Sequence, residues 1–449
     1  MTLNFKESMF ALAGITAIML LGLFVVGAPT AIIFVGELIF VTIIALLKKH
    51  PYKKLQQVMI AGVSEVLTPI LTLLLIGALV TSWIMGGTMP TLIHFGLKII
   101  DAKAFLLIAF LMCSLTSMIV GTSWGTISTL GIAFLGISNA LGIELVHTAA
   151  ALAAGAIFGD KLSPLSSSVA LASELSGAAH IDCIKANAKT TVIGFLVSIP
   201  LYWYIGTTYD VSGEGAFEQS QALLTAIESE FALGIIPILP PIIVFTLIIL
   251  KVPNIPTFAV GIVLGVLESV FLQGYTMNEV CTAMFSGFRM DENPVIGDVL
   301  NYSGMNGMTS IMILIIFASA FGGVVKVLGI IDALLNKIFS ESSSKGKVTF
   351  AGAVIHTVCF LITGAYYAVN SILAPPLNEA YDKHDLPRAH VGSLLLNGGT
   401  GISPIIPWSG TGIFMSGVFG LTSVWYCVYA PVLWLPLILE PVATVMKRK

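Results

Sequence analysis

Long apolar runs recur along the whole length of this 449-residue chain, and they constrain its fold more than any other feature. Each run, at about 20 residues, is long enough to cross a hydrocarbon layer of roughly 30 Å as a helix. Charged residues make up only 10% of the sequence, whereas soluble domains contain roughly a quarter. Membrane β-barrels would instead need strands that alternate apolar and polar residues. We therefore predict an all-α polytopic membrane protein with about 11–14 membrane segments.

The positions of Lys and Arg predict which loops face the cytoplasm. The segments 48–54, 326–347 and 447–449 are basic, so we expect them on the cytoplasmic side. The loop at 208–230 carries five acidic residues and no Lys or Arg, so we expect it outside. An even number of crossings between residues 8 and 47 then places both termini in the cytoplasm. The protein is predicted to lie in the lipid bilayer of the cell (cytoplasmic or inner) membrane.

Three pairs of segments indicate an internal duplication with a spacing of about 240 residues. The pairs are 68–93 with 310–335, "GTSWGT" (121–126) with "GAYYAV" (364–369), and Ser163-Pro164 with Ser403-Pro404. The first copy follows a basic loop and the second follows an acidic one, so the copies should run in opposite directions across the membrane. Within one membrane domain we expect an N-terminal hairpin (1–55), a first repeat (56–207), connecting loops and helices (208–300) and an inverted second repeat (301–449).

Each repeat has two places where Gly, Ser, Thr and Pro interrupt the apolar sequence. They lie at 120–129 and 158–168, and at 363–371 and 397–412. Backbone that leaves the helix at membrane depth must be satisfied by protein or by a hydrated cavity, so we expect discontinuous helices and paired re-entrant hairpins around a polar site. Hydroxyls and freed carbonyls suit Na⁺ and small zwitterions, and helix N-termini suit carboxylates. Close helix packing is the alternative explanation for these small residues.

The candidate ligands for an ion or substrate are the polar and aromatic residues at these breaks. They are Thr122, Ser123, Trp124, Thr126, Asp160, Ser163, Ser166, Ser167, Asn397, Thr400, Ser403, Trp408, Ser409 and Thr411. Asp160 is the candidate ligand for Na⁺, because an ionisable group inside a membrane segment is costly and by default functional. An interfacial position, where such groups are less costly, is the alternative for Asp160 and its neighbour.

Four further ionisable residues are candidate proton or pairing sites: Lys161, Glu37, Glu65 and Glu268. Lys161 could pair with Asp160 or compete for it, and the three glutamates lie in or beside apolar runs. Glu65, near the end of a span, fits an interfacial position better.

The sequence contains neither a GxxxxGK[ST] loop for ATP nor an HExxH zinc motif. We therefore expect a transporter driven by ion gradients and not an enzyme, with Na⁺ or H⁺ as coupling ions and no bound cofactor. The net charge of −3 gives no indication of a nucleic-acid partner.

Several of these stretches resemble signatures of the NhaC-type Na⁺/H⁺ antiporters of the ion-transporter superfamily. They are "GAIFGDKLSPLS" (155–166), "GTSWGT" (121–126) and "SPIIPWSGTGIFMSGVFG" (403–420), and the similarity extends from about residue 60 to 440. The resemblance implies a scaffold region, a mobile transport region with two re-entrant hairpins, and an elevator-like alternating-access motion, often in a homodimer. It makes Na⁺/H⁺ antiport the leading functional prediction.

The sequence departs from this family pattern at one informative place. After "SPLS" the pattern continues with an aspartate, two threonines and an asparagine, whereas this chain has Ser167, Ser168, Val169 and Ala170. The missing aspartate keeps a second function open, namely Na⁺- or H⁺-coupled transport or exchange of an amino acid or small carboxylate. A passive channel is a remote third reading, because opposed pairs of breaks fit alternating access better than a continuous pore.

Overall fold

The structure is a computed structural model that describes residues 3–99, 101–209, 214–250, 252–330, 344–364, 366–421 and 424–445. Within these ranges every regular element is a helix, and an isolated bridge joins Phe288 to Tyr302. The prediction of an all-α polytopic membrane protein is confirmed. Among the described residues, six helices are long and apolar enough to cross a membrane. They are α2 (Thr30–Leu47), α6 (Ala102–Val120), α9 (Leu145–Leu162), α11 (His180–Thr208), α17 (Thr309–Leu328) and α19 (Lys345–Thr363).

A bent pair adds a possible seventh span. It consists of α4 (Leu67–Met85) and α5 (Thr88–Ile99), whose axes differ in direction by 69°. These spans are fewer than the sequence predicted, because many apolar segments are divided into helices too short to cross alone. The short pieces include α7 (Ser123–Thr126), η2 (Ile127–Gly131), α8 (Ile132–Ala140), α10 (Ser167–Ser176), α21 (Arg388–Leu395), η5 (Leu396–Gly401), η6 (Ser403–Ile405), α22 (Gly410–Phe419), η7 (Trp425–Tyr429) and α23 (Pro431–Val445).

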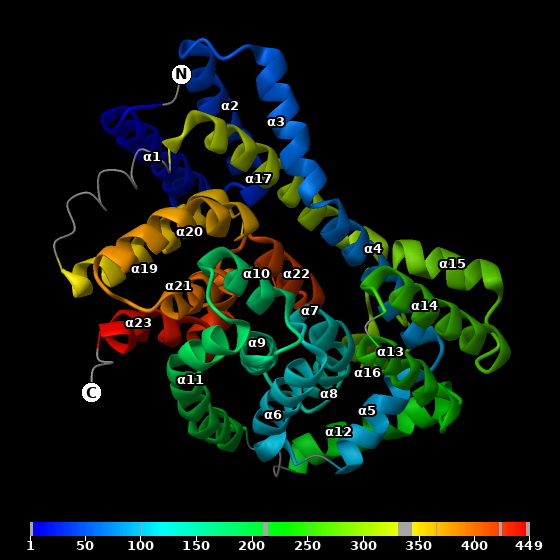
Figure 1. The fold of residues 1–449 in the computed structure, drawn as a ribbon. Helices are drawn as coiled ribbons and strands as arrows, with labels where there is room; N and C mark the ends of the chain where they lie inside the picture. The colour runs from blue at the N-terminus through cyan, green and yellow to red at the C-terminus, as the bar shows by residue number, and fades with distance from the viewer. Residues whose placement is uncertain are drawn as a thin grey trace.

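The remaining elements lie at the two sides of this centre (Figure 1). The N-terminal part holds α1 (Phe5–Leu20), η1 (Leu21–Val26) and α3 (Tyr52–Glu65). A second group follows the first half of the chain and packs around α4 and α5. Its members are α12 (Glu214–Glu230), η3 (Ile236–Ile238), α13 (Leu239–Ile249), α14 (Asn254–Phe271), α15 (Met277–Ser286), α16 (Pro294–Leu300) and η4 (Met305–Met308), while α20 (Tyr366–Lys383) lies beside α19.

Helix boundaries recur at a spacing of 243 residues. The helices α6 and α19 both have 19 residues, and each ends at a left-handed glycine, Gly121 (φ 79°) or Gly364 (φ 60°). The helices α10 and α22 both have 10 residues and are capped by Ser166 and Ser409. A common spacing of this kind is expected from a duplication. The opposite orientation of the two copies stays a prediction.

This spacing changes one of the alignments made from the sequence. Ser163-Pro164 was paired with Ser403-Pro404, but a shift of 243 residues places Ser403 opposite Asp160. Pro164 then corresponds to Pro407. At this spacing, a neutral hydroxyl in the second half corresponds to the carboxylate in the first half.

Glycines allow α3 and α17 to cross closely, in opposite chain directions. A methyl group on Gly62 would collide with the carbonyl of Ser319, and one on Gly323 would collide with the carbonyl of Val58. In membranes, small residues at helix interfaces let backbones approach and gain van der Waals contact. The α3–α17 crossing forms one wall of the cavity described below.

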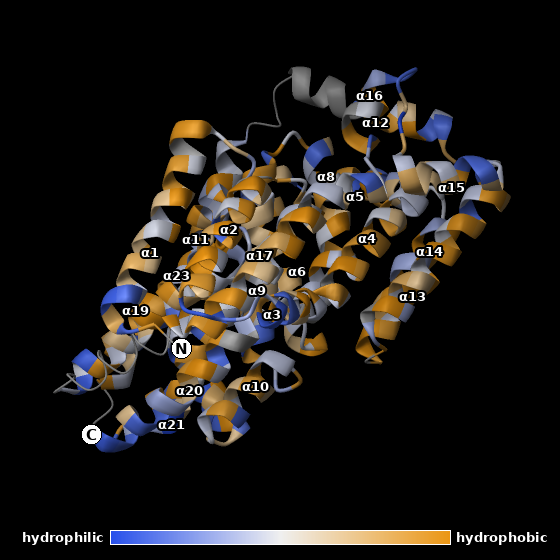
Figure 2. Ribbon diagram, turned by 90° about the horizontal axis from the view of Figure 1, so that it is seen from above, coloured by the Kyte–Doolittle hydropathy of each residue, from blue (hydrophilic) through white to orange (hydrophobic). Residues whose placement is uncertain are grey.

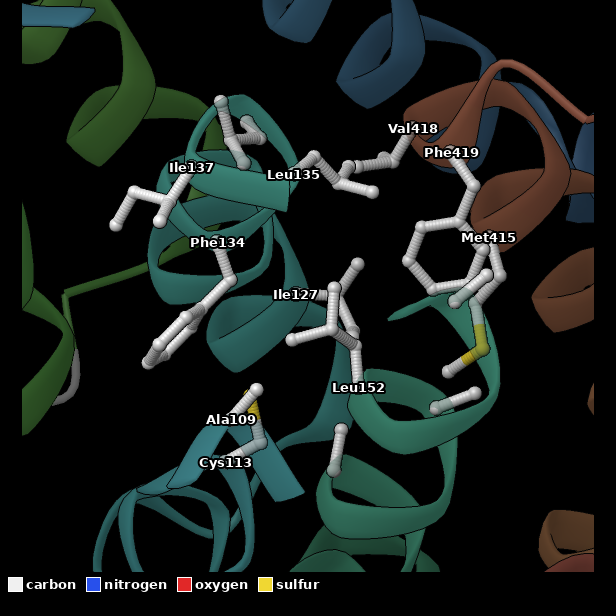
Figure 3. Close-up of a cluster of buried hydrophobic side chains, with 14 of the residues drawn as sticks. Ala109, Cys113, Ile127, Phe134, Leu135, Ile137, Leu152, Met415, Val418 and Phe419 are labelled. Atoms are coloured by element: carbon white, nitrogen blue, oxygen red, sulfur yellow. The ribbon is translucent and has the colours of Figure 1, made fainter. Parts of the chain in front are cut away.

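Hydrophobic side chains join the two halves of the chain. Met415, Val418 and Phe419 of α22 face Ile127 and Leu135 of the η2–α8 segment in a common buried cluster (Figure 3). Helices such as α1 and α13 consist mostly of hydrophobic residues (Figure 2), and several of these residues are exposed, as expected for contact with lipid. The short helix α22 is thereby fixed against the first half, and this contact brings the breaks of both halves together.

Candidate ion-binding site

A cavity of about 660 Å³ lies between the α3–α17 crossing and the helix breaks. The breaks that reach it are those between α6 and α7, α9 and α10, α19 and α20, and η5 and α22. Its polar lining comes from Thr68, Thr122, Ser123, Asp160, Ser167, Ser168, Ser319, Lys326, Thr363, Tyr366, Thr400, Ser403 and Thr411. The breaks predicted from the sequence therefore meet around one space, as the paired-hairpin interpretation requires.

Two glycines let the breaks of each half touch. A methyl group on Gly121 would lie 2.8 Å from the backbone carbon of Leu165, and one on Gly364 would lie 2.8 Å from the carbonyl oxygen of Trp408. Leu165 and Trp408 are again 243 residues apart. Both glycines also have positive φ, which side chains other than glycine rarely adopt. In each half, a close backbone contact at a glycine thus holds the first helix break against the second.

Asp160 is the acidic residue of the cavity and is 6% exposed. Its Oδ2 accepts hydrogen bonds from Ser123 Oγ at 2.7 Å and from the Ser123 backbone N–H at 3.2 Å. Its Oδ1 accepts one from Ser166 Oγ at 2.5 Å. Three donors on one carboxylate offset part of the cost of a charge held away from water.

The residues around Asp160 are positioned by helix starts. Ser166 is the N-cap of α10, where its hydroxyl also accepts the backbone N–H of Ser168 at 3.1 Å. Thr122 caps α7 in the same way, through the N–H of Gly125 at 3.4 Å. Ser and Thr are favoured at such positions because their oxygens satisfy N–H groups that have no partner within the helix. The caps therefore fix both the helix starts and the hydroxyls that contact the carboxylate.

The second half supplies a neutral counterpart of this arrangement. Ser403 Oγ lies 3.1 Å from Ser409 Oγ, and Ser409, the N-cap of α22, donates to the carbonyl of Ser403 at 2.6 Å. Thr400 donates to the Tyr366 hydroxyl at 3.2 Å. The cavity thus has one acidic side and one side of hydroxyl groups.

Two tryptophans connect the breaks to neighbouring helices. Trp124 stacks on Phe414 with ring centroids 4.3 Å apart, and its indole N–H donates to Thr411 at 3.4 Å. Trp408 donates to the carbonyl of Leu361 at 2.6 Å. Both indoles line the cavity while holding its walls in place.

The structure brings together most of the ligands predicted from the sequence. Nine line the cavity: Thr122, Ser123, Trp124, Asp160, Ser167, Thr400, Ser403, Trp408 and Thr411. Ser166 and Ser409 are not part of the cavity lining and act as the N-caps of α10 and α22. Three others lie outside the cavity lining. Ser163 accepts the N–H of Leu165, Thr126 donates to the carbonyl of Thr122, and Asn397 belongs to a separate buried cluster.

The four candidate proton or pairing residues are dispersed. Lys161 is fully buried and does not line the cavity. Glu37 is buried in α2, where neither carboxylate oxygen has a hydrogen-bond partner within the described structure. Glu268 accepts from Thr88 at 3.0 Å, beside α5. The side chain of Glu65 lies outside the described residues.

Residues 121–125 also match the letters of the GxSxG nucleophile motif. That motif requires a sharp turn from a strand into a helix, whereas Ser123 follows the helix α6 and donates its hydroxyl to Asp160. The serine is held as a hydrogen-bond donor to the carboxylate.

Sequence reasoning missed two features that belong to the same region. Lys326 of α17 lines the cavity, although it was considered only as a topological signal. Glu440 and His390 form a fully buried pair behind α9. An intramembrane glutamate in the last apolar run, "LPLILEPVATV", was the available signal for that pair.

Comparison with known proteins gives consistent matches over most of the chain. A sequence profile of the Na⁺/H⁺ antiporter family matches residues 1–206 and 155–440. The chain is 33% identical to the malate-2H⁺/Na⁺-lactate antiporter of Bacillus subtilis (strain 168), over 86% of this chain and 82% of that protein. It is 32% identical to the Na⁺/H⁺ antiporter NhaC of Alkalihalophilus pseudofirmus, over 93% and 90%. It is 25% identical to the arginine/ornithine antiporter ArcD of Halobacterium salinarum, over 95% and 88%.

Proposed function

This chain belongs to the Na⁺/H⁺ antiporter family, and from that premise we propose that Na⁺ is exchanged for H⁺ across the membrane through binding at Asp160. The observation that carries this assignment is the buried Asp160 carboxylate at the cavity wall, held by Ser123 and Ser166. We place the transporter in the cell membrane.

The donor set suits a monovalent hard cation. Carboxylate and hydroxyl oxygens are the ligands that such cations prefer, and each hydroxyl carries lone pairs as well as a hydrogen. Ser123 and Ser166 now donate to Asp160, and on arrival of Na⁺ they can turn their lone pairs to the ion. Each hydrogen bond from a serine hydroxyl to Asp160 would then be replaced by a contact between that hydroxyl and Na⁺, and the carboxylate would keep its position.

Exchange requires that the site open to each side in turn. We propose that the α9–α10 and η5–α22 breaks move as a unit against the α3–α17 crossing, in an elevator-like manner and within a homodimer. The cavity lies between these two groups of helices, so a relative displacement would change its access without dismantling Asp160 and its caps. Loss of exchange on cross-linking the two groups would support this motion.

Transport by purified protein in liposomes tests the assignment. A pH-sensitive dye inside vesicles with an acidic lumen should report alkalinisation when NaCl is added outside, and Asp160→Asn should abolish it. Glu268→Gln is the matched control, because Glu268 is also a buried carboxylate but lies beside α5. Unchanged Na⁺-driven alkalinisation in Asp160→Asn would exclude Asp160 as the binding site.

The cavity also favours a second candidate function, the coupled transport of a small organic anion or zwitterion. A volume of about 660 Å³ is within the range of small-molecule sites and much larger than a single Na⁺ requires. Lys326 supplies a positive charge in the same space as Asp160. One relative is named as a malate and lactate antiporter and another as an arginine/ornithine antiporter, so organic solutes occur among similar proteins.

A ligand panel separates the two functions. Hydroxy acids and amino acids of three to six carbons would be added to the purified protein in NaCl, and thermal stability would be measured. A solute that raises the melting temperature in the wild type but not in Lys326→Gln supports the second function. Lys347→Gln, at an exposed position in the first turn of α19, is the control substitution.

A further inference from the structure

A second polar cluster is buried behind α9, around Glu440 of α23. Its Oε2 accepts hydrogen bonds from Ser393 at 2.6 Å and from Asn397 at 2.8 Å. Its Oε1 lies 3.1 Å from His390 Nδ1 and accepts from Thr444 at 3.3 Å. Glu440 is 0% exposed and His390 2% exposed. A carboxylate with so many donors in a membrane interior is a built site and not an accident of packing.

Lys161 stands between this cluster and the cavity. It is fully buried, its Nζ has no hydrogen-bond partner among the described residues, and it interacts electrostatically with both Glu440 and Asp160. Asp160 and Lys161 are neighbours on α9, so their side chains point about 100° apart around the helix. Lys161 therefore does not line the cavity, and both carboxylates interact with its amine.

Within the described structure, the other titratable groups around Glu440 and His390 are few. Tyr381 of α20 interacts electrostatically with Glu440. Arg388 begins the same helix as His390 but is exposed and pairs with Asp382 at 2.6 Å. The buried charges to be balanced are thus Asp160, Lys161, Glu440 and the imidazole of His390.

Charge balance in this buried group links the two sites. With Asp160 and Glu440 ionised and the Lys161 amine protonated, the group carries a net charge of −1, which is costly away from water. Either Na⁺ at Asp160 or a proton on His390 restores neutrality, but both together would leave an excess positive charge. Imidazole is the side chain that gains and loses a proton near neutral pH.

We propose that the His390–Glu440 pair is a second binding site, whose ligand is the exchanged proton. When Na⁺ leaves Asp160, one proton from water binds to the imidazole of His390 and is held by the Glu440 carboxylate. When Na⁺ binds, the same proton returns to water. This inference rests on the proposed function. It assigns the exchanged proton to His390, on the other side of α9, and not to Asp160.

Proton release on Na⁺ binding tests this inference. Purified wild-type protein in weakly buffered detergent should acidify the solution when NaCl is added in place of choline chloride. His390→Gln should still be stabilised by NaCl but release no proton, and Glu440→Gln should also lose the release. His94→Gln is the matched control, because His94 is likewise buried and lies 3.5 Å from a carboxylate, Glu228. Proton release at the wild-type level in His390→Gln would overturn the proposal.

A measurement on the wild type covers the case in which these variants do not fold. The infrared difference spectrum on adding Na⁺ should show loss of imidazolium bands. Loss of a protonated carboxylic acid band instead would place the proton on a carboxyl group and contradict the inference. If the wild type showed no response to Na⁺ in any of these assays, the proposed function itself would fail, and that outcome is distinct from both results.

Discussion

Asp160 is held by hydroxyl and backbone donors, although the next residue in the chain is a lysine. Consecutive residues of a helix point in different directions, so Asp160 reaches the cavity while Lys161 faces Glu440. This division leaves the carboxylate free of a permanent ion pair. The acid can then bind a mobile cation, because its partners are neutral groups that can reorient.

Ser166 has two functions, and its loss should affect both. Ser166→Ala removes a hydrogen bond to Asp160 and the N-cap of α10, and loss of a cap costs about 1 kcal/mol. We expect a lower melting temperature and a several-fold higher Na⁺ concentration for half-maximal transport. Ser173→Ala, which removes a hydroxyl that donates to the carbonyl of Ala178 just after α10, should leave Na⁺ dependence unchanged. If the two variants had the same Na⁺ dependence, Ser166 would not take part in ion binding.

At this scale the sequence pointed to Asp160 and Ser166 because they lie within one short motif, and to Ser123 because it lies in a second motif of the same kind. Glu440 and His390 were missed for a physical reason. Each lies alone in its own apolar segment, and they meet only because α21 and α23 pack together. No local pattern joins residues 50 positions apart.

At the scale of elements, the breaks are as important as the helices. Gly121 and Gly364 end α6 and α19 in the left-handed conformation and pack against the second break of the same half. Each pair of breaks is therefore one unit, held by backbone contact. Any side chain at these glycines would separate the two breaks.

A comparison of two glycine substitutions tests this contact. Gly121→Ala meets both an unfavourable φ and the backbone of Leu165, whereas Gly142→Ala meets an unfavourable φ of 65° with nothing within 4 Å. The unfavourable φ should lower the free energy of unfolding of each variant by about 1–2 kcal/mol. We expect Gly121→Ala to be the less stable in thermal unfolding and to lose Na⁺ transport. Equal stability of the two variants would show that the contact is unimportant.

The turn between α20 and α21 carries an exposed ion pair and has its own pH dependence. Hydrogen bonds from Arg388, at 2.6 and 3.0 Å, lower the pKa of Asp382. A carboxyl with a lowered pKa stabilises the folded state above its unfolded pKa of about 3.9, and this stabilisation is lost as the pH falls through the folded value. Arg388→Gln should therefore melt slightly below the wild type at pH 7. The difference should shrink as the pH falls below about 4 and on through the lower folded pKa, and a difference that grew on acidification would contradict this.

The sequence predicted where the helices break, because Gly, Pro and hydroxyl residues gather there. Its pairing of 121–126 with 364–369 already has the spacing of 243 residues that the helix boundaries show, whereas the repeated Ser-Pro pair suggested a spacing three residues shorter. Helix caps and left-handed glycines define that register. They become visible only when the backbone is known.

At the scale of the whole molecule, the cavity exists because the two halves meet. The short helix α22 of the second half packs on the η2–α8 segment of the first, and the α3–α17 crossing closes the opposite wall. One half brings a carboxylate and the other brings hydroxyls to the same space. Apolar composition was enough to predict a membrane protein of helices, but this assembly depends on side-chain packing between segments far apart in the sequence.

The central claim is that Asp160 binds Na⁺, and thermal unfolding of purified protein in NaCl or choline chloride tests it most directly. A ligand at 100 times its Kd stabilises the folded state by about 2.7 kcal/mol, so the wild type should melt at a higher temperature in NaCl. The difference should shrink as the pH falls, because protons oppose Na⁺ binding. Asp160→Asn should show no difference between the salts, while Glu268→Gln should behave as the wild type. An Asp160→Asn variant that NaCl stabilises as much as the wild type would contradict the account.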